Sequence, residues 1–184
     1  MRKLIPLLTL LLAGCQSDPY AHLYSKAEQA KPHEPLLIVP FERVGKITPD
    51  MTVDDVIAAV GKPDRRNAPT NLEYLRYGYS VMARRNGQVI LIQCGDPCDK
   101  TSALIKMFAG RTKEGIGMES TRSEIIAAFG QPTVAGPWGD GEERLEYKDH
   151  GLSFVLADGK VHFLAVDFRK PSSTRDAAKP PLSK

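Results

Sequence analysis

The spacing of apolar residues predicts two short helices. In the first, apolar side chains recur three or four residues apart, which places them on one helix face. They are Val53, Val56, Ile57 and Val60. The segment Ile125-Ile126-Ala127-Ala128-Phe129 predicts the second helix. Each helix is about nine residues long and must pack against another element, because isolated helices of this length are marginal in water.

Capping residues mark where these helices begin and end. Each helix follows a threonine with a carboxylate three residues later, the spacing of a capping box. The pairs are Thr121 with Glu124 and, as a weaker version, Thr52 with Asp55. Gly61 and Gly130 stand where a helix end favours a left-handed residue, and a proline two positions later prevents continuation. We therefore expect each helix to end at its glycine.

Strand patterns follow each helix. The predicted strands are 72–77, 79–84 and 89–93 after the first helix, and 145–148, 152–156 and 161–166 after the second. Asn86-Gly87 and Asp158-Gly159 are strong hairpin signals between neighbouring strands. The alternation in 152–156 indicates a sheet with one better-buried face, and we expect the helices to pack on that face.

The two halves of the core resemble each other in sequence. Residues 56–63 align with residues 125–132, and Leu72-Glu73-Tyr74 recurs as Leu145-Glu146-Tyr147. The predicted fold class is α+β: a tandem repeat of a helix plus an antiparallel three-stranded meander, with the helices packed on one face of the sheet. The pattern of residues 104–108 fits a strand or a short helix, and both alternatives stay open.

The N-terminus has the pattern of an export signal. Arg2-Lys3 precedes an apolar run over 4–12 that is as long as a signal core and too short to span a membrane. Leu12-Ala13-Gly14-Cys15 resembles the lipobox of bacterial lipoproteins. This resemblance implies cleavage before Cys15 and lipid on that cysteine. By the same resemblance, Gln16 in place of aspartate implies the outer membrane, with the protein facing the periplasm, over the inner membrane or the cell surface.

Composition separates a folded core from its two ends. The predicted organisation is a signal peptide over 1–14, a lipidated proline-rich spacer over 15–40, a first repeat over 41–100, a second repeat over 101–168 and a disordered basic tail over 169–184. The formal net charge of +3 is the sum of +2 in the signal, +4 in the tail and about −3 in the rest of the chain. A basic face for nucleic acid is therefore not expected.

Cys94 and Cys98 form a pair once the lipid-bearing cysteine is set aside. In an oxidising periplasm we expect a local disulfide between them. A metal site needs further ligands, and the nearest histidine in sequence is His150. A thioredoxin-type motif has two intervening residues, whereas Gly95-Asp96-Pro97 makes three. We predict no metal and no cofactor, and a thiol-redox role stays as a less favoured alternative.

Candidate partner-binding residues are Trp138, Arg65 and Arg66. Trp138 lies in the glycine-rich stretch 136–141, which we expect to be a loop, and it either projects as an anchor or folds back on the sheet edge as part of the core. The arginines either make weak contacts with anionic lipid or peptidoglycan or are solvated charges. A nucleophile elbow and a phosphate-binding loop are both missing from the sequence, so no catalytic residue is predicted.

Several of these motifs carry a family likeness. Asp50-Met51-Thr52, Gly61-x-Pro63, the Tyr-rich strand over 74–79 and Gly87-x-Val89 resemble the SmpA/OmlA lipoproteins, the small subunit of the outer-membrane β-barrel assembly machine. Asp50 replaces the glycine usual in that family. The second repeat is similar to tandem-repeat lipoproteins that share the fold of β-lactamase inhibitor protein. The resemblance implies a protein that binds other proteins with a sheet surface and loops, without chemistry of its own.

The sequence therefore favours a non-enzymatic, membrane-anchored periplasmic lipoprotein. We expect it to act as a protein–protein interaction module in outer-membrane or envelope assembly or maintenance. Its predicted partner is an envelope protein, and its link to the membrane is the N-terminal lipid. The alternative is an inhibitor or regulator of a periplasmic or secreted enzyme, by analogy of fold.

Overall fold

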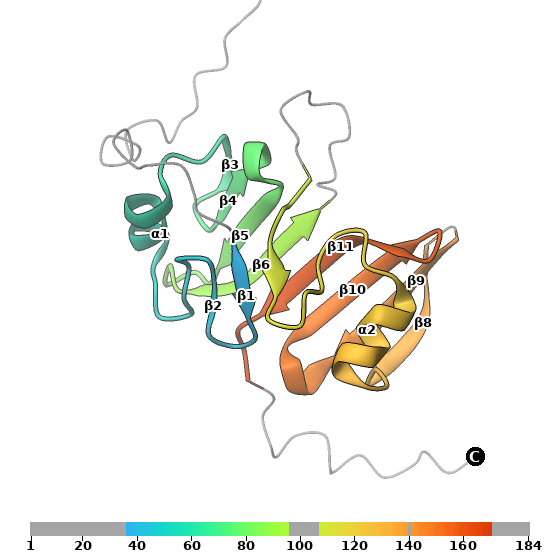
Figure 1. The fold of residues 1–184 in the computed structure, drawn as a ribbon. Coiled ribbons are helices and arrows are strands. Elements are labelled where there is room, and N and C mark those ends of the chain that lie inside the picture. Colours follow the sequence, from blue (N-terminus) through green and yellow to red (C-terminus); the bar gives the residue numbers. More distant parts are fainter. Residues whose placement is uncertain (1–35, 96–106, 140, 171–184) are drawn as a thin grey trace, which may run out of the picture.

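An antiparallel sheet of eight strands forms the main layer of the protein, seen in a computed structural model that describes residues 36–95, 107–139 and 141–170 (Figure 1). The strand order is β3-β4-β5-β6-β11-β10-β9-β8. Their bounds are β3 Arg65–Ala68, β4 Asn71–Tyr74, β5 Tyr79–Ala83, β6 Val89–Gly95, β8 Val134–Gly139, β9 Glu142–Tyr147, β10 Leu152–Ala157 and β11 Lys160–Asp167. Short 3₁₀ turns at Leu75–Tyr77 and Lys148–His150 join β4 to β5 and β9 to β10.

A second layer covers one face of this sheet. It consists of α1 (Val53–Val60), α2 (Arg122–Phe129) and a small sheet of β1 (Leu37–Val39), β2 (Arg43–Val44) and β7 (Arg111–Thr112). In the small sheet, β1 pairs antiparallel with β2 and parallel with β7. Figure 1 shows the small sheet lying between the two helices, so the three elements together form the covering layer.

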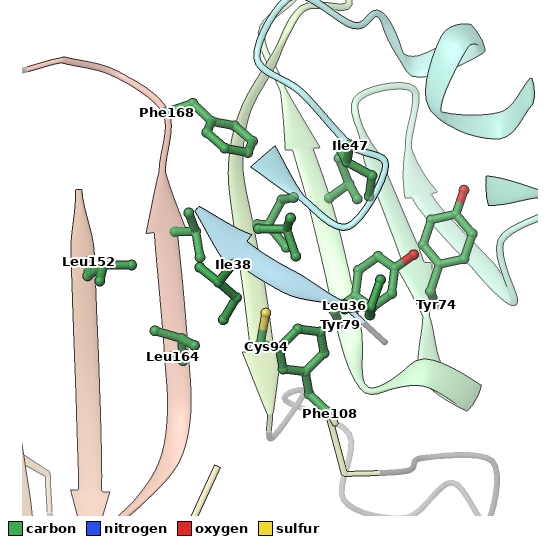
Figure 2. Packing of buried hydrophobic residues seen from close by; sticks show 14 of the residues in the cluster. Leu36, Ile38, Ile47, Tyr74, Tyr79, Cys94, Phe108, Leu152, Leu164 and Phe168 are labelled. Carbon is green, nitrogen blue, oxygen red and sulfur yellow. The ribbon is translucent and has the colours of Figure 1, made fainter. Parts of the chain in front are cut away.

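The hydrophobic core lies between the two layers. Figure 2 shows it bringing together Ile38 from β1, Leu164 from β11 and Cys94 from β6. Tyr79 and Phe108 meet edge to face in the same core, with ring centres 6.0 Å apart. These side chains come from both halves of the chain and belong to one buried cluster. A single core is therefore shared by the whole described structure.

Both helices begin where the capping pattern predicts. The Thr121 amide donates to Glu124 Oε2 at 2.6 Å, and the Glu124 amide donates back to Thr121 Oγ1 at 3.3 Å. Thr52 and Asp55 make the same reciprocal pair at 2.9 and 3.3 Å. The two capping boxes are thus confirmed, including the one that the sequence predicts less strongly.

Equivalent tyrosines tie down the ends of the two helices. Gly61 and Gly130 have the expected positive φ, at 101° and 76°, but their ψ values are extended, so neither residue is in the left-handed helical conformation. Tyr74 Oη donates to the Gly61 carbonyl at 3.0 Å, and Tyr147 Oη donates to the Gly130 carbonyl at 3.1 Å. Each hydroxyl satisfies a carbonyl that the helix leaves without an internal donor.

The predicted fold class is wrong. The described structure is mainly β, with an eight-stranded and a three-stranded sheet and two helices of eight residues each, rather than a repeat of a helix plus a three-stranded meander. The prediction missed β3 and β8, which lie at the two edges of the large sheet. Edge strands bury fewer side chains and tolerate proline, so these segments lack the apolar alternation of central strands.

The structure also bears on two other segments of the sequence prediction, residues 37–39 and residues 104–108. Leu37–Val39 lies within the predicted spacer, yet it forms β1, and Ile38 is fully buried. In the ambiguous segment 104–108, residues 104–106 lie outside the described residues. Met107 and Phe108 have no regular secondary structure, although Phe108 is buried in the core.

Candidate interaction face

The second face of the large sheet is left uncovered by the helices and the small sheet, and we call it the open face. One residue from each strand forms a row across it, because paired residues in neighbouring strands point to the same side. In order from β3 to β8 the row is Arg65, Glu73, Ser80, Gln93, Ala165, Ser153, Glu146 and Val134. Six of these eight side chains are half-exposed, while Glu73 is buried and Val134 is exposed.

A hollow of about 500 Å³ lies on the β8 side of this face. Small side chains in the middle of the row, Ser153 and Ala165, form its floor. Larger residues lie at the two ends of the hollow, which are separated along the strand direction. One end is mainly apolar and aromatic, with Val155, Phe163 and Trp138, and the other is polar and charged, with Lys148, Asp167 and Arg169. The hollow is of the size that accommodates small ligands or a few side chains.

Trp138 lies at the apolar end of the hollow. It belongs to strand β8 and not to the loop that the sequence predicts, and the pairing of β8 with β9 shifts register at this residue. Such a bulge re-aims a side chain out of the regular pleat. The indole is 55% exposed, so the alternative of Trp138 as part of the core is wrong.

Arg144 holds the exposed indole in place. Its guanidinium carbon lies 4.4 Å from the centre of the Trp138 ring, within the range of a cation–π contact. The same guanidinium forms an ion pair with Glu146 and donates to Ser153 Oγ at 3.4 Å. A large aromatic surface is therefore presented on a pre-positioned side chain, which lowers the entropy lost on binding.

Lys148 differs from the other cations that line the hollow. Arg144 is paired with Glu146, and Arg169 with Asp167, where Nε lies 2.9 Å from Oδ1 and Nη2 lies 2.5 Å from Oδ2. The Asp167 carboxylate raises the pKa of Arg169 above its usual value by hydrogen bonding. Among the described residues, Lys148 forms no ion pair within 4.0 Å.

The sequence pattern of β9 and the residue after it indicates the half of the open face that contains the hollow. Arg144, Glu146 and Lys148 alternate with Leu145 and Tyr147, which are buried. The sequence prediction used only the buried members of this alternation, to place the strand. The charged members could have been recognised as one exposed face, but the neighbouring strands that complete the hollow could not.

Arg65 and Arg66 lie on β3, at the opposite edge of the sheet from Trp138. Arg65 forms an ion pair with Glu73 at 3.7 Å, and Arg66 donates to the Pro69 carbonyl at 2.5 Å. Seven steps of roughly 4.8 Å separate the edge strands, or about 34 Å along the row. The structure therefore does not join the predicted arginines and Trp138 into one site.

Cys94 is a buried residue of β6 and is a free thiol in the structure. Burial raises its pKa well above the usual range of a thiol, so the reactive thiolate is disfavoured. Its predicted partner Cys98 and the predicted lipidation site Cys15 both lie outside the described residues. The disulfide and the lipid anchor therefore stay predictions.

Both described histidines, His150 and His162, lie against neighbouring side chains. His150 lies in the turn after β9, with its ring 5.3 Å from that of Phe129. His162 is half-buried in β11, with Nε2 3.3 Å from Glu142 Oε1. Within 36–95, 107–139 and 141–170, no cluster of three or more potential metal ligands occurs. In the same ranges, no helix has the length and apolar character that a membrane span requires.

A second hollow, of about 460 Å³, lies on the opposite layer between α2 and the segment 111–120. Three of its four charged residues are already engaged within the protein. Glu124 caps α2, Glu119 lies 3.5 Å from Lys160, and Arg111 donates to the Gly115 carbonyl at 2.8 Å.

Comparison with known protein families found no match for this chain, and comparison with curated proteins found none either. Among solved structures, the chain is similar to a DUF4309 family protein (YjgB) from Bacillus subtilis subsp. subtilis str. 168. The similarity has a TM-score of 0.46 and 16% sequence identity, and it covers 68% of this chain and 84% of that protein.

Proposed function

We propose that this protein is a non-enzymatic, lipid-anchored periplasmic lipoprotein that binds a partner protein with the open face of its large sheet. The observation that carries the proposal is the hollow on this face, with Trp138 exposed at its edge. Tryptophan and arginine are among the residues enriched in binding hot spots, and here they stack on each other. We propose that this binding supports outer-membrane or envelope assembly or maintenance.

The position of the N-terminal elements supports binding from an anchored state. The described chain begins at Leu36, which packs into the core on the covered side of the sheet. A tether from Cys15 would therefore join the protein opposite the open face. Residues 16–35 reach at most about 70 Å when fully extended, and the open face stays free to contact a partner because the tether joins the other side.

Site-specific photocrosslinking in intact cells tests the open face. A benzophenone amino acid replaces Phe163 in the hollow, and the matched control places it at the exposed Ser123 on α2, in the covering layer. We expect a protein adduct from position 163 that is lost in Trp138→Ala. Adducts from position 123 together with none from position 163 would contradict the proposal.

The anchor is tested separately. Mass spectrometry of the mature N-terminal peptide should show acyl chains on Cys15, and Cys15→Ser should move the protein from the membrane fraction to the soluble fraction. More than one chain is needed for stable anchoring, so the loss should be nearly complete. An unmodified Cys15 in the mature wild-type protein would rule out the lipoprotein assignment.

A further inference from the structure

The hollow on the open face has an uneven charge distribution. Three cations and two carboxylates line it, and four of these five groups neutralise each other as the pairs Arg144–Glu146 and Arg169–Asp167. The remaining group is the Lys148 ammonium, which forms no ion pair among the described residues. A partner is therefore not required to supply a strongly charged surface. One carboxylate placed at Lys148 completes the charge balance of the hollow.

The apolar and cationic ends lie a defined distance apart. Arg144 contacts Trp138 at the apolar end, and Lys148 lies at the cationic end. The two residues are four positions apart, where β9 continues into the turn at Lys148–His150. At roughly 3.3 Å per residue, the two positions are about 13 Å apart along the strand direction. An extended peptide covers that length with about four residues. Between the two ends, Ser153 and Ala165 are small enough to leave the floor low.

We infer that the hollow binds an extended segment of another protein that carries an apolar side chain and, about four residues away, a carboxylate. The inference rests on the proposed binding function of the open face. The apolar side chain packs on Val155 and Phe163 beside the Trp138 ring, and the carboxylate accepts hydrogen bonds from the Lys148 ammonium. The hollow is too small for a folded domain, so the partner inserts a loop or a terminal segment.

Peptide selection on the full mature chain tests this chemistry. A random twelve-residue peptide library displayed on phage is selected against the protein, and the recovered peptides are synthesised. We expect an acidic residue three to five positions from a large apolar residue, and a change in the fluorescence of Trp138, the only tryptophan of the chain. Lys148→Gln should weaken binding about tenfold, the effect of one charge-assisted hydrogen bond. Lys113→Gln, an exposed lysine of the covering layer, should leave it unchanged.

Other outcomes overturn the inference in distinguishable ways. The inference is refuted if the selected peptides change Trp138 fluorescence but lack an acidic residue. It is also refuted if they bind Lys148→Gln as tightly as wild type. In both cases the open face remains a binding surface. Peptides that bind without affecting Trp138, together with no adduct from position 163, would refute the proposed function as well. Deletion of 171–184 that raises peptide affinity would assign the hollow to the protein's own tail. Self-association abolished by Trp138→Ala would assign it to a second copy.

Discussion

At the scale of single residues, some glycines have no room for a side chain, whereas others face open space. Gly151 has a φ of 60°, and a Cβ placed on it would meet the Asp167 carbonyl and the Phe41 ring. Phe41 itself has a positive φ of 60°, which is unusual for a bulky residue. Gly136 on β8, in contrast, has open space where its Cβ would lie. The two glycines therefore differ in what a methyl group would cost.

Gly151→Ala should destabilise the protein by about 2 kcal/mol or more, because it combines a steric clash with an unfavourable backbone conformation. Gly136→Ala is the matched control and should change the free energy of unfolding by less than about 1 kcal/mol, in the stabilising direction. Urea denaturation of the two variants and the wild type measures the difference. Equal stability of both variants would contradict the packing described around Gly151.

The Cys94 thiol should be protected from reagents in the folded protein. It is 1% exposed, and burial raises its pKa, so both access and thiolate formation are suppressed. Under reducing conditions, iodoacetamide should modify Cys94 only after the protein is unfolded in guanidinium, as peptide mass spectrometry will report. Omitting the reductant tests the predicted disulfide, since a Cys94–Cys98 bond would block labelling of both residues even in guanidinium. Rapid modification of native Cys94 would reopen the thiol-redox alternative.

At the scale of elements, the two helices are similar at their N-termini and differ in their packing. Four residues of α1 are buried, whereas Ile125 is the buried residue of α2. The helix α2 is therefore attached to the sheet by fewer apolar contacts. Its capping box then contributes a larger share of the interactions that hold it, because short helices have little intrinsic stability.

The capping boxes predict a pH dependence of stability. Hydrogen bonds from the Thr52 side chain and amide lower the pKa of Asp55, and bonds from the Thr121 amide and side chain lower that of Glu124. A folded-state pKa below the unfolded value stabilises the protein above the unfolded pKa, and this stabilisation is lost as the pH falls through the folded pKa. Both carboxyls should therefore contribute at neutral pH and not in acid.

Asp55→Asn combined with Glu124→Gln should lower the free energy of unfolding at pH 7, and the difference from wild type should shrink toward pH 2. Urea denaturation at both pH values measures it. Asp54→Asn is the matched control, since Asp54 lies in the same first turn of α1 outside the capping box. A loss of stability at pH 7 that persists unchanged at pH 2 would show that the capping carboxylates act through something other than their charge.

At the scale of the whole molecule, the two halves of the sheet are joined into one structure. Strand β6 pairs with β11 in the middle of the sheet, with Cys94 opposite Leu164 and Ile92 opposite Val166. All four side chains are buried. The small sheet then crosses the junction, since β1 comes from the N-terminal half of the described chain and β7 from the C-terminal half. The predicted repeats over 41–100 and 101–168 therefore share backbone pairing as well as a core.

This shared core predicts that the molecule unfolds in one cooperative transition. Hydrogen exchange with mass spectrometry at increasing urea should show the amides of β4–β5 and β9–β10 losing protection at the same midpoint. Leu164→Ala, which removes a buried side chain at the junction, should destabilise both halves equally, by about 2–5 kcal/mol. Separate midpoints for the two halves would indicate two independent folding units.

Several features of the protein could be predicted from the sequence because they depend on local interactions. Thr52 and Thr121 cap their helices through residues only three positions away. Asp158-Gly159 turns the chain between β10 and β11, where both residues have positive φ. Alternation placed Leu152 and Phe154 on the buried face. Each of these signals lies within a few residues, so no knowledge of distant partners is needed.

The tertiary structure alone decided which segments complete the sheet and where the binding face lies. Arg65–Ala68 and Val134–Gly139 become strands because a neighbouring strand offers its backbone groups, although their own side chains carry little strand signal. Ile38 is buried because β1 crosses a junction formed by residues far along the chain. The hollow combines residues from β6, β8, β9, β10 and β11, which pair only after folding. Long-range pairing depends on the whole chain, and a local pattern does not encode it.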